Sequence, residues 1–452
     1  MSLFRRFTAV ALTAGLVLPA VNGGAQQPKS TRITFDDAVG IALKQNLSVR
    51  QAENTASLGQ ASVTQQKMQL LPDLRLSVSG SNNIGRNFSQ SDGAIINQQT
   101  QALSSGLSSS FTLFDGGKTA AAIHSAEANE QASSADLSRT KQTAVFTVAQ
   151  NYVTLSNQQE QLAVQQENLT AQQAQLDLIQ KLVDAGSRPV SDLYQQQAAV
   201  ANAKLSVAQA SHAVELAKVD LIQTLQLDPA GTYDFVAPKV SDASLTKTPN
   251  LDSLVALAYE NRADLDADQA RVDAAGQDVK AAKAAKLPTI SLTGAYSTAY
   301  SSASDLSLSN QLDQRRGGSV GVGISIPIFD RGSANVAEQR AAIQQENAQL
   351  ALDAQKQSVA LDVRRSYLDQ QSAIEQLAAA KAQLTAASQA VDMTTKRYQA
   401  GAATLVEVTQ AQAQRVQAAS AVATAQNNLV LQQTVMSYYT GSLDPKNVHL
   451  GE

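Results

Sequence analysis

The sequence predicts a mainly helical protein that also contributes strands to a β-barrel, built as two copies of one structural unit. Three observations predict it. Short motifs recur at an almost constant distance along the chain. Long stretches without proline carry apolar residues every seven positions, which is typical of coiled-coil helices. Stretches beside them alternate apolar and polar residues, which is typical of strands. Each unit is therefore expected to hold a long antiparallel helical hairpin and two transmembrane strands.

The internal repeat extends over most of the chain. Its offsets are 329 − 114 = 215, 401 − 186 = 215 and 287 − 71 = 216 residues, so about one residue of slippage separates the copies. We predict a first unit over 26–227, a connection over 228–250, a second unit over 251–441 and a tail over 442–452. The recurring motifs are Leu71-Pro72 and Leu287-Pro288, Phe114-Asp115-Gly116-Gly117 and Phe329-Asp330-Arg331-Gly332, and Ala185-Gly186 and Ala400-Gly401.

The first 25 residues have the pattern of a secretory signal. Arg5 and Arg6 precede an apolar stretch over 7–21, and small residues follow, with cleavage expected after Ala25. That stretch is too short to span a bilayer comfortably. Beyond it, no run reaches about 18 apolar residues, so an ordinary transmembrane helix is not expected. If the mature chain enters a membrane, we expect it to do so as strands.

Composition excludes several classes of function. The chain has no cysteine, which excludes disulfides, thiolate metal sites and a cysteine nucleophile. Its 35 basic and 39 acidic residues give a net charge of −4, with no basic surplus for nucleic acid. His124, His212 and His449 are scattered and form no metal-spaced cluster. We expect no enzyme, no cofactor and no bound metal.

The first long helix is predicted over 117–184, which contains no proline and no internal glycine. Its 184 − 117 + 1 = 68 positions would span on the order of 100 Å at about 1.5 Å per residue. A return helix is predicted over 191–226, and the second copy repeats the pair over 332–399 and 405–439. Gln370 and Arg415 interrupt the second copy's apolar spacing. The first seam is formed by Val148, Leu155, Leu162, Leu169, Leu176 and Val183.

The strands are predicted from period-two alternation. The clearest, over 319–329, sets valine and isoleucine against glycine and serine, and its expected partner is 289–300 across a polar loop, 301–318. The first copy offers strands over about 73–80 and 107–114, joined by a polar loop, 81–106.

Strands of roughly ten residues have the length that crosses a bilayer when tilted. An open sheet edge leaves unpaired backbone groups in hydrocarbon, so four strands require further chains. Two, three or four chains would give eight, twelve or sixteen strands, and the pattern does not choose among them. The competing interpretation is a solid coiled-coil rod with small terminal sheets.

The duplicated order of these motifs resembles that of the TolC family of outer-membrane export channels. Leucine-proline before a strand, the Phe114 and Phe329 motifs after one, and Arg397-Tyr398-Gln399-Ala400-Gly401 at the second tip carry the resemblance. It implies a homotrimer with a 12-stranded β-barrel in the cell outer membrane and an α-helical tunnel projecting into the periplasm. It also implies two partners, a periplasmic adaptor and an inner-membrane transporter of the RND, ABC or MFS type. The chain would then be the passive exit duct of a tripartite efflux or type I secretion system.

The glycines fall at the ends of the predicted helices. Gly116, Gly117 and Gly332 fit sharp turns from strand to helix, which we interpret as structural. Gly186 and Gly401 mark the exposed hairpin tips. By resemblance, the tip residues that contact the adaptor are Gly186, Val190, Leu193, Gly401, Leu405 and Val408.

The resemblance also implies a narrow periplasmic aperture. The family's acidic positions fall on Glu407 and Gln410, with Asp192 at the corresponding place in the first copy. A ring of such acids could filter ions, although solvated helix-end acids are an equal alternative. Tyr398 matches a tyrosine that bonds to a neighbouring chain, for which Asp192 is the candidate acceptor. The family's accompanying arginine falls on Ala403, and Arg188 or Arg397 could replace it.

Two other classes of function remain open at this point. A periplasmic adaptor also carries a long helical hairpin, but usually one hairpin flanked by compact domains. A secreted enzyme would need a ligand-sized pocket with convergent titratable groups.

Overall fold

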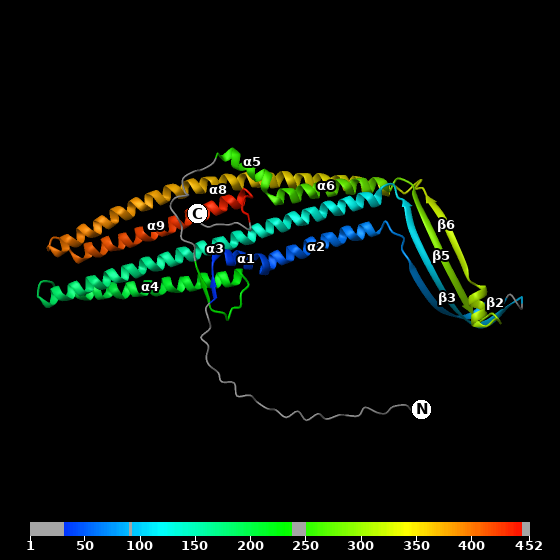
Figure 1. The fold of residues 1–452 in the computed structure, drawn as a ribbon, viewed down its shortest axis with the longest axis horizontal. Helices are drawn as coiled ribbons and strands as arrows, with labels where there is room; N and C mark the ends of the chain where they lie inside the picture. The colour runs from blue at the N-terminus through cyan, green and yellow to red at the C-terminus, as the bar shows by residue number, and fades with distance from the viewer. Residues whose placement is uncertain (1–30, 90–92, 237–249, 445–452) are drawn as a thin grey trace, which may run out of the picture.

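The computed structural model describes residues 31–89, 93–236 and 250–444. The predicted signal over 1–25 lies outside these residues, as do most of the predicted connection and tail. The described chain is elongated, with long helices lying side by side and a single four-stranded sheet continuing from one end (Figure 1). The hairpin tips lie at the opposite end (Figure 1).

Two helical hairpins form most of the molecule. In each copy the long helix has 67 residues and the return helix has 35. The sequence placed them at 117–184, 191–226, 332–399 and 405–439. The observed helices are α3 (Lys118–Asp184), α4 (Val190–Thr224), α8 (Ser333–Gln399) and α9 (Leu405–Tyr439).

Each return helix covers only the tip-side half of its long helix, and shorter helices continue the layer towards the sheet (Figure 1). Helix α2 packs on α3, while α6 packs against both α3 and α8. In both copies the short helices are split by one residue, Asn46 or Arg262, which ends one helix and begins the next. They are α1 (Phe35–Gln45), α2 (Leu47–Met68), α5 (Leu251–Asn261) and α6 (Ala263–Ala284).

The sheet has the strand order β2-β3-β5-β6, and every neighbouring pair is antiparallel. The predicted strand 289–300 corresponds to β5, and the predicted strand 319–329 to β6, which ends at Ser325 before Pro327. Proline has no N–H for a strand ladder, which explains the earlier end. The strands are β2 (Arg75–Ser89), β3 (Ala94–Phe114), β5 (Thr289–Ser301) and β6 (Gly317–Ser325).

One predicted loop was wrong, and the other contains a short helix. The segment 81–106 is mostly strand, because the pairing of β2 with β3 continues from Arg75 opposite Ser108 to Ser89 opposite Ala94. The predicted strands 73–80 and 107–114 were therefore too short. Polar side chains on much of this hairpin hid its alternation. The loop 301–318 contains a short helix, α7 (Leu308–Gln314), which is held on β5 by a hydrogen bond from the Thr298 hydroxyl to the Leu312 carbonyl, 2.7 Å.

The two faces of the sheet differ in chemistry. Val320, Val322 and Ile324 of β6 point to the same face as Leu76 and Val78 of β2, and all five are exposed in the single chain. Serine, threonine and glycine dominate the other face. A sheet that exposes its apolar side chains is suited to hydrocarbon on that face and to water on the other.

The predicted connection 228–250 is more than a linker. Part of it forms β4 (Tyr233–Phe235), which pairs in parallel with β1 (Thr31–Ile33). The buried Tyr152 ring of α3 packs edge-on against Phe35 and Phe235, and its hydroxyl donates to the Ile33 carbonyl, 3.2 Å. The segment between the repeats is thus fastened to the start of the first unit.

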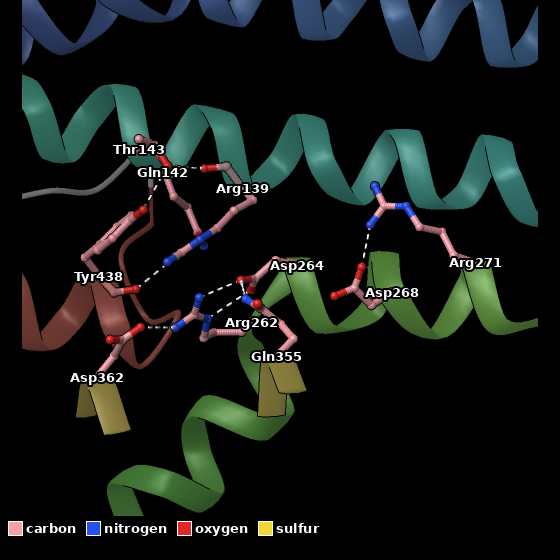
Figure 2. Close-up of polar contacts among 10 residues, drawn as sticks. All are labelled: Arg139, Gln142, Thr143, Arg262, Asp264, Asp268, Arg271, Gln355, Asp362 and Tyr438. Atoms are coloured by element: carbon pink, nitrogen blue, oxygen red, sulfur yellow. Dashed lines mark hydrogen bonds and ion pairs between the residues drawn. The ribbon is translucent and has the colours of Figure 1, made fainter. Parts of the chain in front are cut away.

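A buried ionic group fastens the second unit (Figure 2). The Arg262 side chain, 5% exposed, donates to Asp264 through Nε at 2.9 Å and lies 3.9 Å from Asp362 of α8. Burial by itself raises the pKa of Asp264, but the hydrogen bonds and charge of Arg262 outweigh it and leave this pKa below its ordinary value. Nearby, Arg139 of α3 donates to the Tyr438 carbonyl at the end of α9, 3.0 Å. Four helices therefore meet at this joint.

We expect Arg262→Met to lower the free energy of unfolding by about 3 kcal/mol, because it leaves the Asp264 carboxylate, only 19% exposed, with the hydrogen bond from Gln355 but without its ion-pair partner. The measurement is thermal unfolding in detergent, followed by circular dichroism at 222 nm. Arg271→Met is the matched control, since Arg271 pairs with Asp136 and Asp268 while nearly half exposed and should cost only about 0–1 kcal/mol. Equal destabilisation by the two variants would contradict the role of burial.

Candidate functional site at the hairpin tips

Both hairpins turn through the same backbone motif. Gly186 and Gly401 have φ of +70° and +78°, a left-handed conformation that favours glycine. At the first tip, Ser187 N–H bonds to the Leu182 carbonyl at 2.8 Å and Gly186 N–H bonds to the Val183 carbonyl at 2.9 Å. The second tip repeats both bonds. This is the Schellman motif, which ends a helix sharply and satisfies its last carbonyls.

The second return helix begins with a capping box. The Thr404 hydroxyl accepts from Glu407 N–H at 3.3 Å, and the Glu407 carboxylate accepts from Thr404 N–H at 3.0 Å. The bond from Thr404 N–H lowers the pKa of the Glu407 carboxyl most, and the Thr404 hydroxyl, which donates to the same carboxylate at 3.1 Å, lowers it further. Glu407 is exposed and also lies 3.7 Å from Arg397. The predicted aperture acid is thus held in place by the helix that it caps.

An apolar cluster joins the two tips. Tyr398 of α8 is fully buried in it, with Leu405 and Val408 of α9 and Ile179 of α3, and Leu193 of α4 packs at its edge. The structure therefore brings four of the predicted site residues together: Leu193, Tyr398, Leu405 and Val408.

The other predicted residues lie outside this cluster. Gly186 and Gly401 form the turns themselves. Val190 and Glu407 are exposed on the first turns of the return helices, and Gln410 is exposed on the second turn of α9. Ala403, which stands where the TolC family has an arginine by resemblance, is buried in the cluster.

The predicted bond of Tyr398 forms within one chain. Its hydroxyl donates to Asp192 Oδ2 at 3.2 Å, whereas the sequence analysis expected an acceptor from a neighbouring chain. The reason is the tip cluster, which places the first turn of α4 beside the last turn of α8. Burial raises the pKa of Tyr398, and the charge of Asp192 raises it further.

Arg188 is the arginine that engages Tyr398. Its guanidinium lies 4.3 Å from the centre of the tyrosine ring, and its Nη2 donates to the Tyr398 carbonyl at 2.6 Å. Arg397, the other candidate, instead donates to the Ala402 carbonyl at 3.1 Å and pairs with Glu407. The first hairpin therefore holds Tyr398 through both Asp192 and Arg188.

A chain of three glutamines, two of them buried, was missed by the sequence analysis. The Gln196 amide donates to the Gln172 carbonyl at 3.0 Å and to its side-chain oxygen at 2.7 Å. The Gln172 amide donates in turn to Gln412 Oε1 at 2.9 Å. These residues join α4, α3 and α9 just beyond the tip cluster. Glutamine occurs on every face of these helices, so no sequence signal distinguished the buried ones.

The turns at the sheet end are structural. Gly117 and Gly332 have φ of +88° and +80°, and Asp115 and Asp330 accept hydrogen bonds from their N–H groups at 3.0 and 2.9 Å. At Gly116, φ is +70° and a Cβ would lie 2.8 Å from that of Leu287. The aspartates cap the long helices, which accounts for the repeated motif.

Within the described ranges, no group of three or more histidine, aspartate or glutamate side chains could hold a metal ion. Among the described helices, none carries an apolar stretch long enough to cross a membrane.

Comparison with known proteins identifies the family. The family model described as "Outer membrane efflux protein" matches residues 38–225 and again 254–442. The chain belongs to this family. It is therefore an outer-membrane exit channel, and the adaptor alternative is set aside.

Curated relatives agree with this assignment. The outer membrane efflux protein BepC of Brucella suis is 24% identical over 73% of this chain and 70% of its own length. The pyoverdine export outer membrane protein OpmQ of Pseudomonas aeruginosa is 26% identical over 80% of this chain and 74% of its own length. Outer membrane protein TolC of Vibrio cholerae is 22% identical over 85% of both chains.

Solved structures share the fold. A structure of CusC superposes with a TM-score of 0.79 at 22% identity, covering 90% of this chain and 92% of that one. VceC from Vibrio cholerae superposes with a TM-score of 0.75 at 19% identity, covering 90% and 96%. The chain therefore shares the fold of these outer-membrane proteins.

We expect Arg188→Ala to loosen the tip. It removes the ring contact and the hydrogen bond to the Tyr398 carbonyl, so amide hydrogen exchange over 398–403 should become about tenfold faster, as for a loss of about 1.4 kcal/mol. Arg397→Ala is the matched control. The Arg397 side chain is exposed, so its loss should change the exchange rates over 398–403 little. An equal effect of both variants would refute the special role of Arg188.

Proposed function

We propose that three copies of this chain form one passive duct through the outer membrane, with a closed barrel continued by a helical tunnel. The observation that carries the proposal is the sheet, whose apolar face is exposed and whose outer strands, β2 and β6, have no further strand beside them in the described chain. Open edges are not tolerated in hydrocarbon. Pairing β6 of one copy with β2 of the next closes the sheet, and three copies give the twelve strands that the family resemblance implies.

The helices support the same assembly. Val336, Ile343 and Leu350 recur every seven residues on α8, and about half of each side chain is exposed in the single chain. Leu205, Leu216 and Val219 similarly expose apolar side chains on α4. Apolar positions at heptad spacing normally pack against another helix. Neighbouring copies of the chain would supply it.

We place the docking surface for a periplasmic adaptor at the tips. Of the six predicted contact residues, Val190 is exposed, while Leu193, Leu405 and Val408 shape the surface from the cluster beneath it. Tyr194 and Val406 add exposed apolar side chains beside them. An inner-membrane transporter of the RND, ABC or MFS type, which the family resemblance implies, would supply cargo and energy.

We place the gate at the same end. Asp192 and Glu407 of three copies would bring acidic groups together around the aperture, which attracts cations and disfavours closure by mutual repulsion. The Tyr398 contacts with Asp192 and Arg188 oppose this repulsion by holding each pair of tips together. Gln410, exposed beyond Glu407, would line the same opening. Opening then requires each chain to move both hairpins or to break these contacts.

We expect Gly401→Pro and Glu407→Lys to impair export without preventing barrel insertion. Proline cannot adopt the φ of +78° at position 401, and lysine at 407 destroys the capping box beside Arg397. The measurement is cargo accumulation in cells, with heat-modifiable migration of the membrane fraction as the readout of insertion.

Glu375→Lys is the control, because it makes the same charge change on an exposed part of α8 far from the tip. Normal export by both tip variants would contradict a functional role for the tips. Export loss accompanied by loss of membrane insertion would also count against it.

A further inference from the structure

The polar face of the sheet has an unusual composition. At its described side chains, β2, β3, β5 and β6 present only serine, threonine, alanine, asparagine, glycine and one arginine, Arg75. In the proposed duct this face lines the water-filled bore, so the inference below rests on that function. The rows of the face are fixed by the register, in which Ser77 lies opposite Gly106, and Gly106 opposite Ser297.

Several hydroxyl groups of this face bond to the sheet itself. The Ser77 hydroxyl donates to the Gly106 carbonyl at 3.2 Å, and the hydroxyls of Ser79 and Ser104 share a hydrogen bond of 2.7 Å. On the other pair of strands, the Thr293 hydroxyl donates to the Gly321 carbonyl at 3.4 Å. Hydroxyl donors that are engaged in this way offer little to hold a passing molecule.

Arg75 has its own counter-ion. Its Nε lies 2.8 Å from Asp73 Oδ2, and both side chains are exposed. Asp73 continues the register of β2, because its N–H bonds to the Ser110 carbonyl at 3.1 Å and its Oδ1 accepts from Ser110 N–H at 2.6 Å. The two residues are two positions apart, so they lie on the same face. One positive and one negative charge thus meet where the sheet joins the helices.

We propose that the barrel wall is neutral towards cargo because Asp73 and Arg75 cancel, so that the barrel passes organic ions of either sign as well as uncharged amphiphiles. Two opposite charges this close together act on a distant ion as a dipole. At 0.1 M salt, the electrostatic field of this dipole is screened within about 10 Å. Removing either partner would leave a ring of like charges, one from each copy. Charge selection, where it occurs, belongs to the aperture and not to the barrel.

The test is the reversal potential of single channels in planar bilayers under a gradient of potassium chloride at low ionic strength. The background carries Asp192→Asn and Glu407→Gln, which removes the proposed aperture acids in series with the barrel. Three variants are compared in it: Asp73→Asn, Arg75→Gln and the double variant. Asparagine keeps the oxygen that accepts from Ser110 N–H.

Arg75→Gln should raise the ratio of cation to anion permeability at least twofold, and Asp73→Asn should lower it by a similar factor. The double variant should return to the background value. Arg86→Gln is the matched control, because position 86 lies on the opposite face of the same strand and should leave the ratio unchanged. As a second site, Ser297→Asp should raise cation permeability while the neutral Ser297→Asn should not.

The inference is overturned if the double variant shifts the ratio as far as a single variant, or if neither single variant shifts it. Both of these outcomes require conducting channels and leave the proposed duct standing. Absence of conductance from both the wild-type protein and the background variant, in which Asp192 no longer accepts a hydrogen bond as a carboxylate, would instead overturn the duct, and this inference with it.

Discussion

The structure depends on one constraint, the need to satisfy the backbone hydrogen bonds of a sheet that faces hydrocarbon. Four strands with an exposed apolar face have two free edges, and each edge group left unpaired in a bilayer costs several kcal/mol. In the proposed duct, further copies of the chain pair with these two edges and close the sheet into a barrel. The exposed apolar side chains of α8, which recur every seven residues, and those of α4 fit the same assembly, because burying them would bring the helices of neighbouring copies together. In the proposed assembly, barrel and tunnel are two consequences of the same constraint.

The duplication gives each chain two hairpins, and their contacts with each other determine what the tips can do. Tyr398 is held by Asp192 and Arg188 from the first hairpin while its ring fills the shared apolar cluster. At the middle of the rod, Arg262 and Arg139 join α6, α8, α3 and the end of α9. The two hairpins are thus joined both at their tips, through Tyr398, and near the other end of the return helices, through Arg262 and Arg139. The two hairpins of one chain are therefore suited to move as a unit.

Residues with a local physical requirement were predictable from the sequence. Gly186, Gly401 and Gly332 were placed at turns because such turns need positive φ, and the observed long helices end within two residues of the predicted limits. The hairpin of β2 and β3 was underestimated because its polar face and its glutamines hide the alternation. The intrachain bond of Tyr398 and the choice of Arg188 over Arg397 depend on how two hairpins pack, and no local pattern carries that information.

The most direct test of closure uses the absence of cysteine from the chain. Single cysteines are placed along β2 and β6 in pairs, oxidised in the native membrane and analysed by denaturing electrophoresis without reductant. Closure predicts that some pairs yield covalent species of two and three chains and nothing larger. A scan that yielded only monomers, in protein inserted in the outer membrane, would contradict it.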